Sequence, residues 1–228
     1  MTKDMISDFV SLLFPHCCVV SGEPLAKGEQ LISTGFAAAL PRFDLHTPNE
    51  KFAQKFSGLV CVEHTLAYYK FRKKSGVQKL LHCLKYKNYP EVGEIAGRWF
   101  GEALSRAGYH QHFDLIVPVP LHASKKRKRG YNQSDHIAMG MSVALGVPWS
   151  DQVLIRTAER ESQTRKGRAE RFGNSDNIYQ ITHSEQVLDK NILLIDDVIT
   201  TGATIISCAL LFEGIAKTIS VAALASAE

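Results

Sequence analysis

The segment from Lys190 to Phe212, KNILLIDDVITTGATIISCALLF, constrains the fold of this chain more than any other part. Asn191–Ile195 is a short aliphatic run of strand length, and two adjacent carboxylates, Asp196 and Asp197, follow it directly. Small and hydroxyl-bearing residues come next, and the apolar residues 205–212 then predict a helix. A strand, an acidic pair, a short loop and a helix therefore occur in immediate succession.

The loop between the acids and the helix suits a phosphate group. A helix N-terminus offers unpaired backbone N–H groups and a partial positive charge, and a glycine lets the backbone approach a ligand closely. The loop positions are Thr200, Thr201, Gly202, Ala203 and Thr204. The two preceding carboxylates would repel a phosphate, but they suit the hydroxyls of a ribose diol or a bound Mg²⁺. The combination predicts a 5-phosphorylated ribose as ligand; the alternative is an ordinary capped helix after a buried strand.

Composition indicates a globular protein of a reducing compartment. The chain has 228 residues, of which 45% are hydrophobic and 22% charged, and its five cysteines are an odd number that argues against a disulfide framework. No apolar run is long enough to predict a membrane-spanning helix. Residues 1–14 predict a short amphipathic helix that contains two aspartates and lacks a cleavage site, so we expect a cytoplasmic protein.

The order of the remaining elements predicts an α/β fold. Strand signals near residues 115, 153, 192 and 219 are separated by helical segments, which is typical of a parallel sheet flanked by helices. Residues 65–108 have the spacing of helices, with a turn before Glu91. We therefore expect an N-terminal region over residues 1–64 and a main domain over residues 65–228.

Positive charge is concentrated in one part of the chain. Residues 122–171 hold eleven Lys or Arg against five Asp or Glu, although the whole chain has a net charge of only +4. We expect the five consecutive basic residues to lie in a loop after the strand near 115, beside the acidic pair, with Arg129 contacting a pyrophosphate. The alternative is a single-stranded nucleic acid bound by the other four and stacked on Tyr131. These four residues are Lys125, Lys126, Arg127 and Lys128.

The N-terminal region contains an incomplete zinc pattern. Cys18 is followed three residues later by Ser21 rather than by a second thiol, and Cys61 is followed by His64. A structural zinc site needs four Cys or His ligands, so Cys18, Cys61 and His64 are zinc candidates that lack a partner. The interpretation we favour is that the cysteines are small buried hydrophobic residues.

Four segments together resemble the ComF-type proteins, which are phosphoribosyltransferase-like and include GntX-like members. They are LLHCLKYKNYPEVG, DLIVPVPLHASKKRKRGYNQS, SQTRKGRAERFGN and ILLIDDVITTGAT. The last is similar to the 5-phosphoribosyl-1-pyrophosphate (PRPP) motif of all type I phosphoribosyltransferases, and the resemblance runs from about Tyr68 to the C-terminus. It implies a type I phosphoribosyltransferase fold with a small N-terminal appendage, and a site that binds PRPP with Mg²⁺.

The resemblance also implies roles for single residues. Asp196 and Asp197 would hold the ribose diol at the catalytic centre, and residues 200–204 would bind the 5-phosphate. A flexible loop that closes over PRPP would include Gln163, Arg168 and Arg171. Relatives of this type often carry a four-cysteine zinc module, from which this chain departs at Ser21 and His64.

Three functions are compatible with these observations. ComF-type proteins are associated with DNA uptake in natural competence, so the chain is expected to be a PRPP-binding partner of the DNA-uptake machinery, in contact with single-stranded DNA. Alternatively, it is an active phosphoribosyltransferase acting on an unknown acceptor, or a regulator that senses PRPP without turnover. No residue of the sequence can be identified as a general base from its pattern alone.

Overall fold

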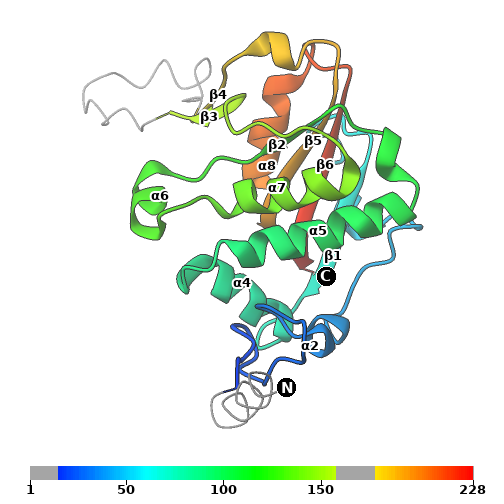
Figure 1. Cartoon of the computed structure of the whole chain (residues 1–228). Helices are drawn as coiled ribbons and strands as arrows, with labels where there is room; N and C mark the ends of the chain where they lie inside the picture. Colours follow the sequence, from blue (N-terminus) through cyan, green and yellow to red (C-terminus); the bar gives the residue numbers. More distant parts are fainter. Residues whose placement is uncertain (1–14, 158–177, 228) are drawn as a thin grey trace.

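A four-stranded parallel sheet organises the part of the chain that the structure describes, residues 15–157 and 178–227 of a computed structural model. The predicted helix over residues 1–14 lies outside these residues. The strand order is β1–β6–β5–β2 (Figure 1). The strands are β1 (Thr65–Phe71), β2 (Leu115–Pro118), β5 (Asn191–Ile199) and β6 (Thr218–Ala227). The predicted α/β class, a parallel sheet flanked by helices, is confirmed.

Helices cover both faces of this sheet (Figure 1). One face carries α4 (Gly76–Tyr86), α5 (Glu91–Arg106) and α7 (Gln133–Leu145). The other carries α8 (Ala203–Ala209), which continues into the 3₁₀ turn η3 (Leu210–Phe212). The remaining elements are short: α2 (Thr34–Ala38), α3 (Glu50–Ala53), η1 (Tyr109–Gln111), α6 (Ala123–Arg129) and η2 (Ser184–Gln186).

The aliphatic run of β5 is buried on both sides because each face of the sheet has its own core. Leu193 and Ile195 pack into the cluster under α4, α5 and α7, whereas Ile192 and Leu194 pack into the cluster under α8. All four side chains have 0% exposure. This double burial explains why the strand sequence is continuously apolar rather than alternating.

Two glycines let α5 and α7 pack with their backbones in contact. A Cβ atom at Gly97 would collide with the carbonyl oxygen of Ile137, and one at Gly140 would collide with the carbonyl oxygen of Glu94. The close approach fixes α7, whose first turn lies at the carboxyl end of β2. The position of α7 matters because its first turn contributes to the candidate site described below.

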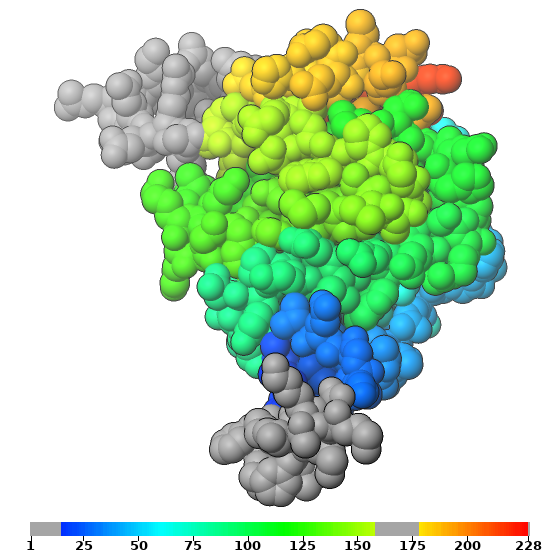
Figure 2. Space-filling model, viewed as in Figure 1, coloured from blue at the N-terminus to red at the C-terminus, as the bar shows by residue number. Residues whose placement is uncertain are grey.

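The N-terminal residues that the structure describes are part of the same body. Cys18 and Val20 belong to the core on the α5 side, and Phe52 and Phe56 belong to the core on the α8 side. Figure 2 shows the first described residues, in blue, packed against one end of the molecule. The residues before β1 therefore complete both cores.

Two expectations about strands are wrong. Residues 65–71, expected to be helical, form the edge strand β1, because a run of apolar residues buried on both faces has no period that separates strand from helix. The strand near residue 153, expected in the parallel sheet, is β3 (Leu154–Arg156) and pairs antiparallel with β4 (Tyr179–Ile181) in a separate two-stranded sheet.

Candidate functional site: an acidic pair and a threonine loop

The acidic pair lies within β5 rather than after it. Strand pairing with β6 continues past both acids to Ile199, which is paired with Ser226. Asp197 has an exposed fraction of only 8%, and its Oδ2 lies 2.9 Å from the Nζ of Lys85, the penultimate residue of α4. The strand backbone therefore holds both carboxylates in place. The ammonium group of Lys85, from a helix far away in the sequence, balances the charge of Asp197.

Burial and, to a smaller extent, the neighbouring charge of Asp197 together raise the pKa of Asp196 to about 7. Two donors oppose this effect: the Ser134 hydroxyl donates to Asp196 Oδ1 at 3.1 Å, and the backbone N–H of Asp197 donates to the same atom at 2.8 Å. A half-desolvated carboxyl group beside a second carboxylate is stabilised by a cation or by hydroxyl donors. This is the chemistry expected of a site for Mg²⁺ or a ribose diol.

The threonine loop is open to solvent and has a fixed backbone. Gly202 has a φ of +88°, which favours glycine, and Thr200, Thr201 and Thr204 are exposed. The loop encloses a small hollow of about 50 Å³ whose lining includes Asp196. Lys55 Nζ, from the N-terminal region, donates to the Thr200 carbonyl oxygen at 2.5 Å.

A cavity of about 310 Å³ joins these parts at the carboxyl ends of β2 and β5. Its lining combines acids, bases and polar side chains from segments far apart in the sequence. They include Lys85, Tyr86, His122, Lys125, Arg129, Gln133, Ser134, Arg156, Tyr179, Asp196, Asp197 and Thr204. Ligands of open parallel sheets bind at this edge, so the cavity is the candidate functional site.

The basic run is a helix, and the expectation that it is a loop is wrong. Residues 123–129 form α6, because lysine and arginine are good helix formers and Gly130, with a φ of +89°, ends the helix. Lys125, Lys126, Arg127 and Lys128 are exposed, and α6 projects from the body (Figures 1 and 2). Only Lys125 and Arg129 of the five line the cavity.

A partly buried carboxyl group links α6 to α7. Asp135 Oδ2 lies 3.8 Å from Lys126 Nζ, and Asp135 Oδ1 accepts from the side-chain amide of Asn132 at 2.6 Å. The same amide donates to the carbonyl oxygen of Val119, just after β2. Burial raises the pKa of Asp135 to about 6, with Lys126 and the Asn132 amide opposing the shift. The first turn of α7 therefore contacts both the basic helix and the segment after β2.

The aromatic residue beside the basic helix is Tyr86, and the expectation that Tyr131 stacks on bases is wrong. Tyr131 is 9% exposed and its hydroxyl donates to the Leu84 carbonyl oxygen at 2.5 Å, so its ring is part of the core. Tyr86 is 68% exposed and lies 5.5 Å below the guanidinium carbon of Arg129. The two tyrosines differ in how exposed their rings are, and the sequence alone does not reveal this difference.

Several site residues escaped prediction from the sequence because they lie far from the acidic pair along the chain. Lys85, Ser134 and Arg156 are examples, each brought in by a different element. Arg156 Nη1 donates to the Tyr179 hydroxyl at 3.2 Å, at the base of the β3–β4 pair. The resemblance did include the motif letters around Lys85 and Ser134, but gave them no role. Gln163, Arg168 and Arg171 lie outside the described residues.

The zinc candidates are not brought together. Cys18 is buried against the core, the exposed Cys61 donates its backbone N–H to Glu213, and His64 Nε2 lies 3.0 Å from His112 Nδ1. Within residues 15–157 and 178–227, no group of three or more His, Cys, Asp or Glu side chains is arranged to hold a metal ion. In the same ranges no helix is long and apolar enough to cross a membrane.

Comparison with known proteins adds named relatives, although no family model matches the chain. The DNA utilization protein YhgH of Salmonella typhimurium is 30% identical over 146 residues, which are 62% of this chain and 63% of that protein. The chain thus spans less than two thirds of the length of this relative. Competence protein ComFC of Bacillus subtilis is 32% identical over 129 residues, 57% of this chain and 50% of that protein. The chain is similar to ComF-type competence proteins.

Solved structures with some likeness to the chain include phosphoribosyltransferases. Adenine phosphoribosyltransferase of Leishmania tarentolae has a TM-score of 0.37 at 16% identity, covering 66% of this chain and 74% of that one. The allosteric regulatory enzyme of purine biosynthesis has a TM-score of 0.43 at 20% identity, covering 62% of this chain and 29% of that one. The names of the relatives in sequence agree with the resemblance to ComF-type proteins that four segments of the sequence indicated.

Proposed function

We propose that this protein binds PRPP with Mg²⁺ in the cavity at the carboxyl ends of β2 and β5, and that it serves DNA uptake in the cytoplasm. The observation that carries the PRPP assignment is one cavity lined by both the acidic pair and Thr204 of the threonine loop. The names of the relatives support the link to DNA uptake. Five unpaired cysteines are in keeping with a reducing compartment.

The residues present fit the parts of PRPP. Asp196 and Asp197 offer oxygen atoms for the ribose hydroxyls and for Mg²⁺, which prefers carboxylate oxygens alongside substrate phosphates. The hydroxyls and backbone N–H groups of Thr200–Thr204 suit the 5-phosphate, and Lys85 and Arg129 supply positive charge for the pyrophosphate. Bound Mg²⁺ would supply neutralisation of the leaving pyrophosphate.

Calorimetric titration of PRPP in the presence of Mg²⁺ tests the assignment. The double variant Asp196→Asn, Asp197→Asn should lose binding by at least about 100-fold, since two charge-assisted contacts are removed. Glu23→Gln, which removes one exposed carboxylate elsewhere, serves as the control. Unchanged affinity in the double variant would reject the ribose assignment.

Two versions of this function differ in turnover. An active phosphoribosyltransferase would release pyrophosphate when the right acceptor is present, through a transition state with oxocarbenium character. A PRPP-sensing regulator would bind PRPP and release none. Assaying pyrophosphate release from Mg²⁺ and PRPP across nucleobases and amines separates the two versions.

The basic surface favours single-stranded DNA as a second ligand. The helix α6 carries four exposed basic residues, Lys125 to Lys128, and its last residue, Arg129, lies over the exposed ring of Tyr86. Residues 65–90 contain seven Lys or Arg and no Asp or Glu. An exposed aromatic ring within a field of positive charge suits stacked bases and a phosphate backbone. Replacing these four α6 residues by alanine should weaken strand binding and flatten its dependence on salt. An unchanged salt slope would remove α6 from this surface.

A further inference from the structure

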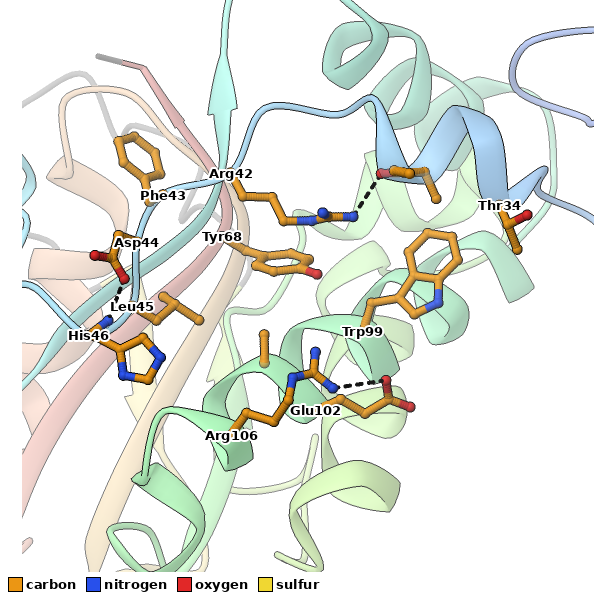
Figure 3. Close-up of a pocket in the computed structure, with 13 residues that line it drawn as sticks. Thr34, Arg42, Phe43, Asp44, Leu45, His46, Tyr68, Trp99, Glu102 and Arg106 are labelled. Carbon is orange, nitrogen blue, oxygen red and sulfur yellow. Dashed lines mark hydrogen bonds and ion pairs between the residues drawn. The ribbon is translucent and has the colours of Figure 1, made fainter.

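A second cavity, of about 540 Å³, lies beside the sheet edge formed by β1 (Figure 3). It is bounded by α2, by residues 42–46 and by the second half of α5. The volume is within the range of small-molecule sites. The cavity shares no lining residue with the cavity at the ends of β2 and β5, so a ligand here would be additional to PRPP.

The interior of this second cavity is aromatic. Tyr68, from β1, is 4% exposed, and its ring is stacked on that of Phe100 with centroids 5.0 Å apart. Trp99, from α5, is partly buried and faces the same space (Figure 3). The phenol and the indole rings come from a strand and a helix, so packing of the core fixes both. Because Tyr68 is almost fully buried, a planar ring entering the cavity would meet the pre-positioned indole of Trp99.

A fixed guanidinium group lies over this aromatic surface. Arg42 Nη2 donates to the carbonyl oxygen of Ala37 at 2.8 Å, and its Cζ lies 5.7 Å from the centre of the Tyr68 ring. Among the described residues, no carboxylate lies within ion-pair distance of Arg42. The oxygens of the nearby Asp44 accept instead from the backbone of His46 and from the Thr47 hydroxyl.

A second arginine lies across the cavity from Arg42 (Figure 3). Arg106 is paired with Glu102 on the same helix, but at 3.9 Å and with 70% of its side chain exposed. Such an exposed pair contributes little and is easily exchanged for a stronger partner. The cavity thus combines aromatic surfaces with one unneutralised guanidinium and one weakly paired guanidinium, and both groups suit a phosphate.

We propose that this second cavity binds a nucleotide, with the base against the partly exposed indole of Trp99 and the phosphate at Arg42. A base needs the aromatic surface and a phosphate needs the guanidinium, so a nucleotide uses both features at once, whereas a sugar phosphate or an uncharged aromatic molecule uses one. The nucleotide is either a free mononucleotide or a unit of a single strand that lies across the cavity. The two sources present the same chemistry and differ in length.

Tryptophan fluorescence gives a direct readout of this site. The chain has two tryptophans, Trp99 and Trp149, so the variant Trp149→Phe leaves Trp99 as the reporter. Titration with adenosine or thymidine monophosphate, and separately with a short oligothymidylate, should quench Trp99 as the base stacks on it. Calorimetry on the unsubstituted protein repeats each titration without relying on the folding of the Trp149→Phe variant.

Substitution of the arginine tests the assignment of the phosphate. Arg42→Ala should weaken nucleotide binding about tenfold or more, because a charge-assisted contact is lost. Arg98→Ala is the matched control: it removes the same charge from an exposed residue beside Trp99 on α5 that does not line the cavity. Saturating PRPP should not displace the nucleotide.

The outcomes separate the possibilities. Quenching by mononucleotides that Arg42→Ala weakens supports a free nucleotide as ligand, and quenching by the oligonucleotide alone, with the same dependence on Arg42, supports a strand. The proposal is overturned if neither probe binds at millimolar concentration, or if Arg42→Ala and Arg98→Ala have equal effects. Displacement by PRPP would also overturn it, since the nucleotide would then occupy the cavity of the acidic pair. The quenching results and the effect of Arg42→Ala do not depend on whether the PRPP assignment is correct.

Discussion

Replacement of Asp196 by asparagine should stabilise the unliganded protein, and by more as the pH rises. Burial and Asp197 raise the pKa of Asp196 from an ordinary value of 3.8 to about 7, so the folded state resists its ionisation. Three pKa units correspond to about 4 kcal/mol of unfolding free energy, because each unit is worth about 1.4 kcal/mol. Asparagine can still accept the hydrogen bonds from Ser134 and from the Asp197 backbone, and it has no charge to desolvate.

The sign of the effect follows from the two protonation states. Below pH 3.8 the carboxyl group is protonated whether the chain is folded or not, so it costs no stability. As the pH rises, the unfolded chain ionises first, and the folded protein loses stability until Asp196 also ionises near pH 7. The gain in Asp196→Asn should therefore be about 2 kcal/mol at pH 5 and about 4 kcal/mol at pH 8.

Urea denaturation at pH 5, 6, 7 and 8 measures this difference. The Glu23→Gln variant, which removes an exposed carboxylate, should show no comparable gain at any of these pH values. Equal or lower stability of Asp196→Asn at pH 8, or a gain that does not change with pH, would refute the view that the site strains Asp196. The same pKa predicts that affinity of the natural protein for PRPP with Mg²⁺ rises between pH 6 and 8, as the carboxylate form becomes available.

Two further substitutions test how the fold supports the site. Gly140→Ala should destabilise the protein by about 3 kcal/mol or more, because the new Cβ would collide with the backbone of α5. Thermal unfolding measures this loss. The control is Gly35→Ala in α2, an exposed position where a Cβ atom meets no close contact. Lys55→Met should weaken PRPP binding about tenfold by releasing the Thr200 carbonyl that Lys55 holds, with little change in unfolding temperature. Lys51→Met, exposed one turn earlier, should leave affinity unchanged, and equal losses in both variants would mean that Lys55 acts only through net charge.

The sequence revealed the contiguous part of the site and missed the part assembled by folding. Only two residues separate the acidic pair from residues 200–204, so the order of residue types alone predicted this part of the candidate site. Lys85 and Ser134 lie 112 and 62 positions away from the acids they contact, and no local pattern marks such pairs. The expectation that Tyr131 stacks on bases failed for a related reason, because only packing decides which tyrosine ring is exposed.

The strands show the same division between local and long-range information. The predicted end of β5 at Ile195 fell four residues short, because the polar residues of the acidic pair look like the start of a loop. Pairing with β6 as far as Ile199 and Ser226 carries the strand through them. Likewise, the apolar residues of β1 are compatible with either a strand or a buried helix. Pairing with the C-terminal strand β6 makes this segment a strand.

The extension of β5 through the acids also bears on function. A loop would let Asp196 turn towards water and relax, whereas strand pairing on the side of β6 holds its backbone in place. The carboxyl group therefore stays partly desolvated, and its pKa stays raised by burial and by Asp197. Lys85 balances Asp197, which leaves Asp196 as the group that gains most from an added cation or hydroxyl donor. Binding of the proposed ligand would recover the stability that is lost at this strand, and a raised pKa of this kind is typical of residues that a fold positions for function.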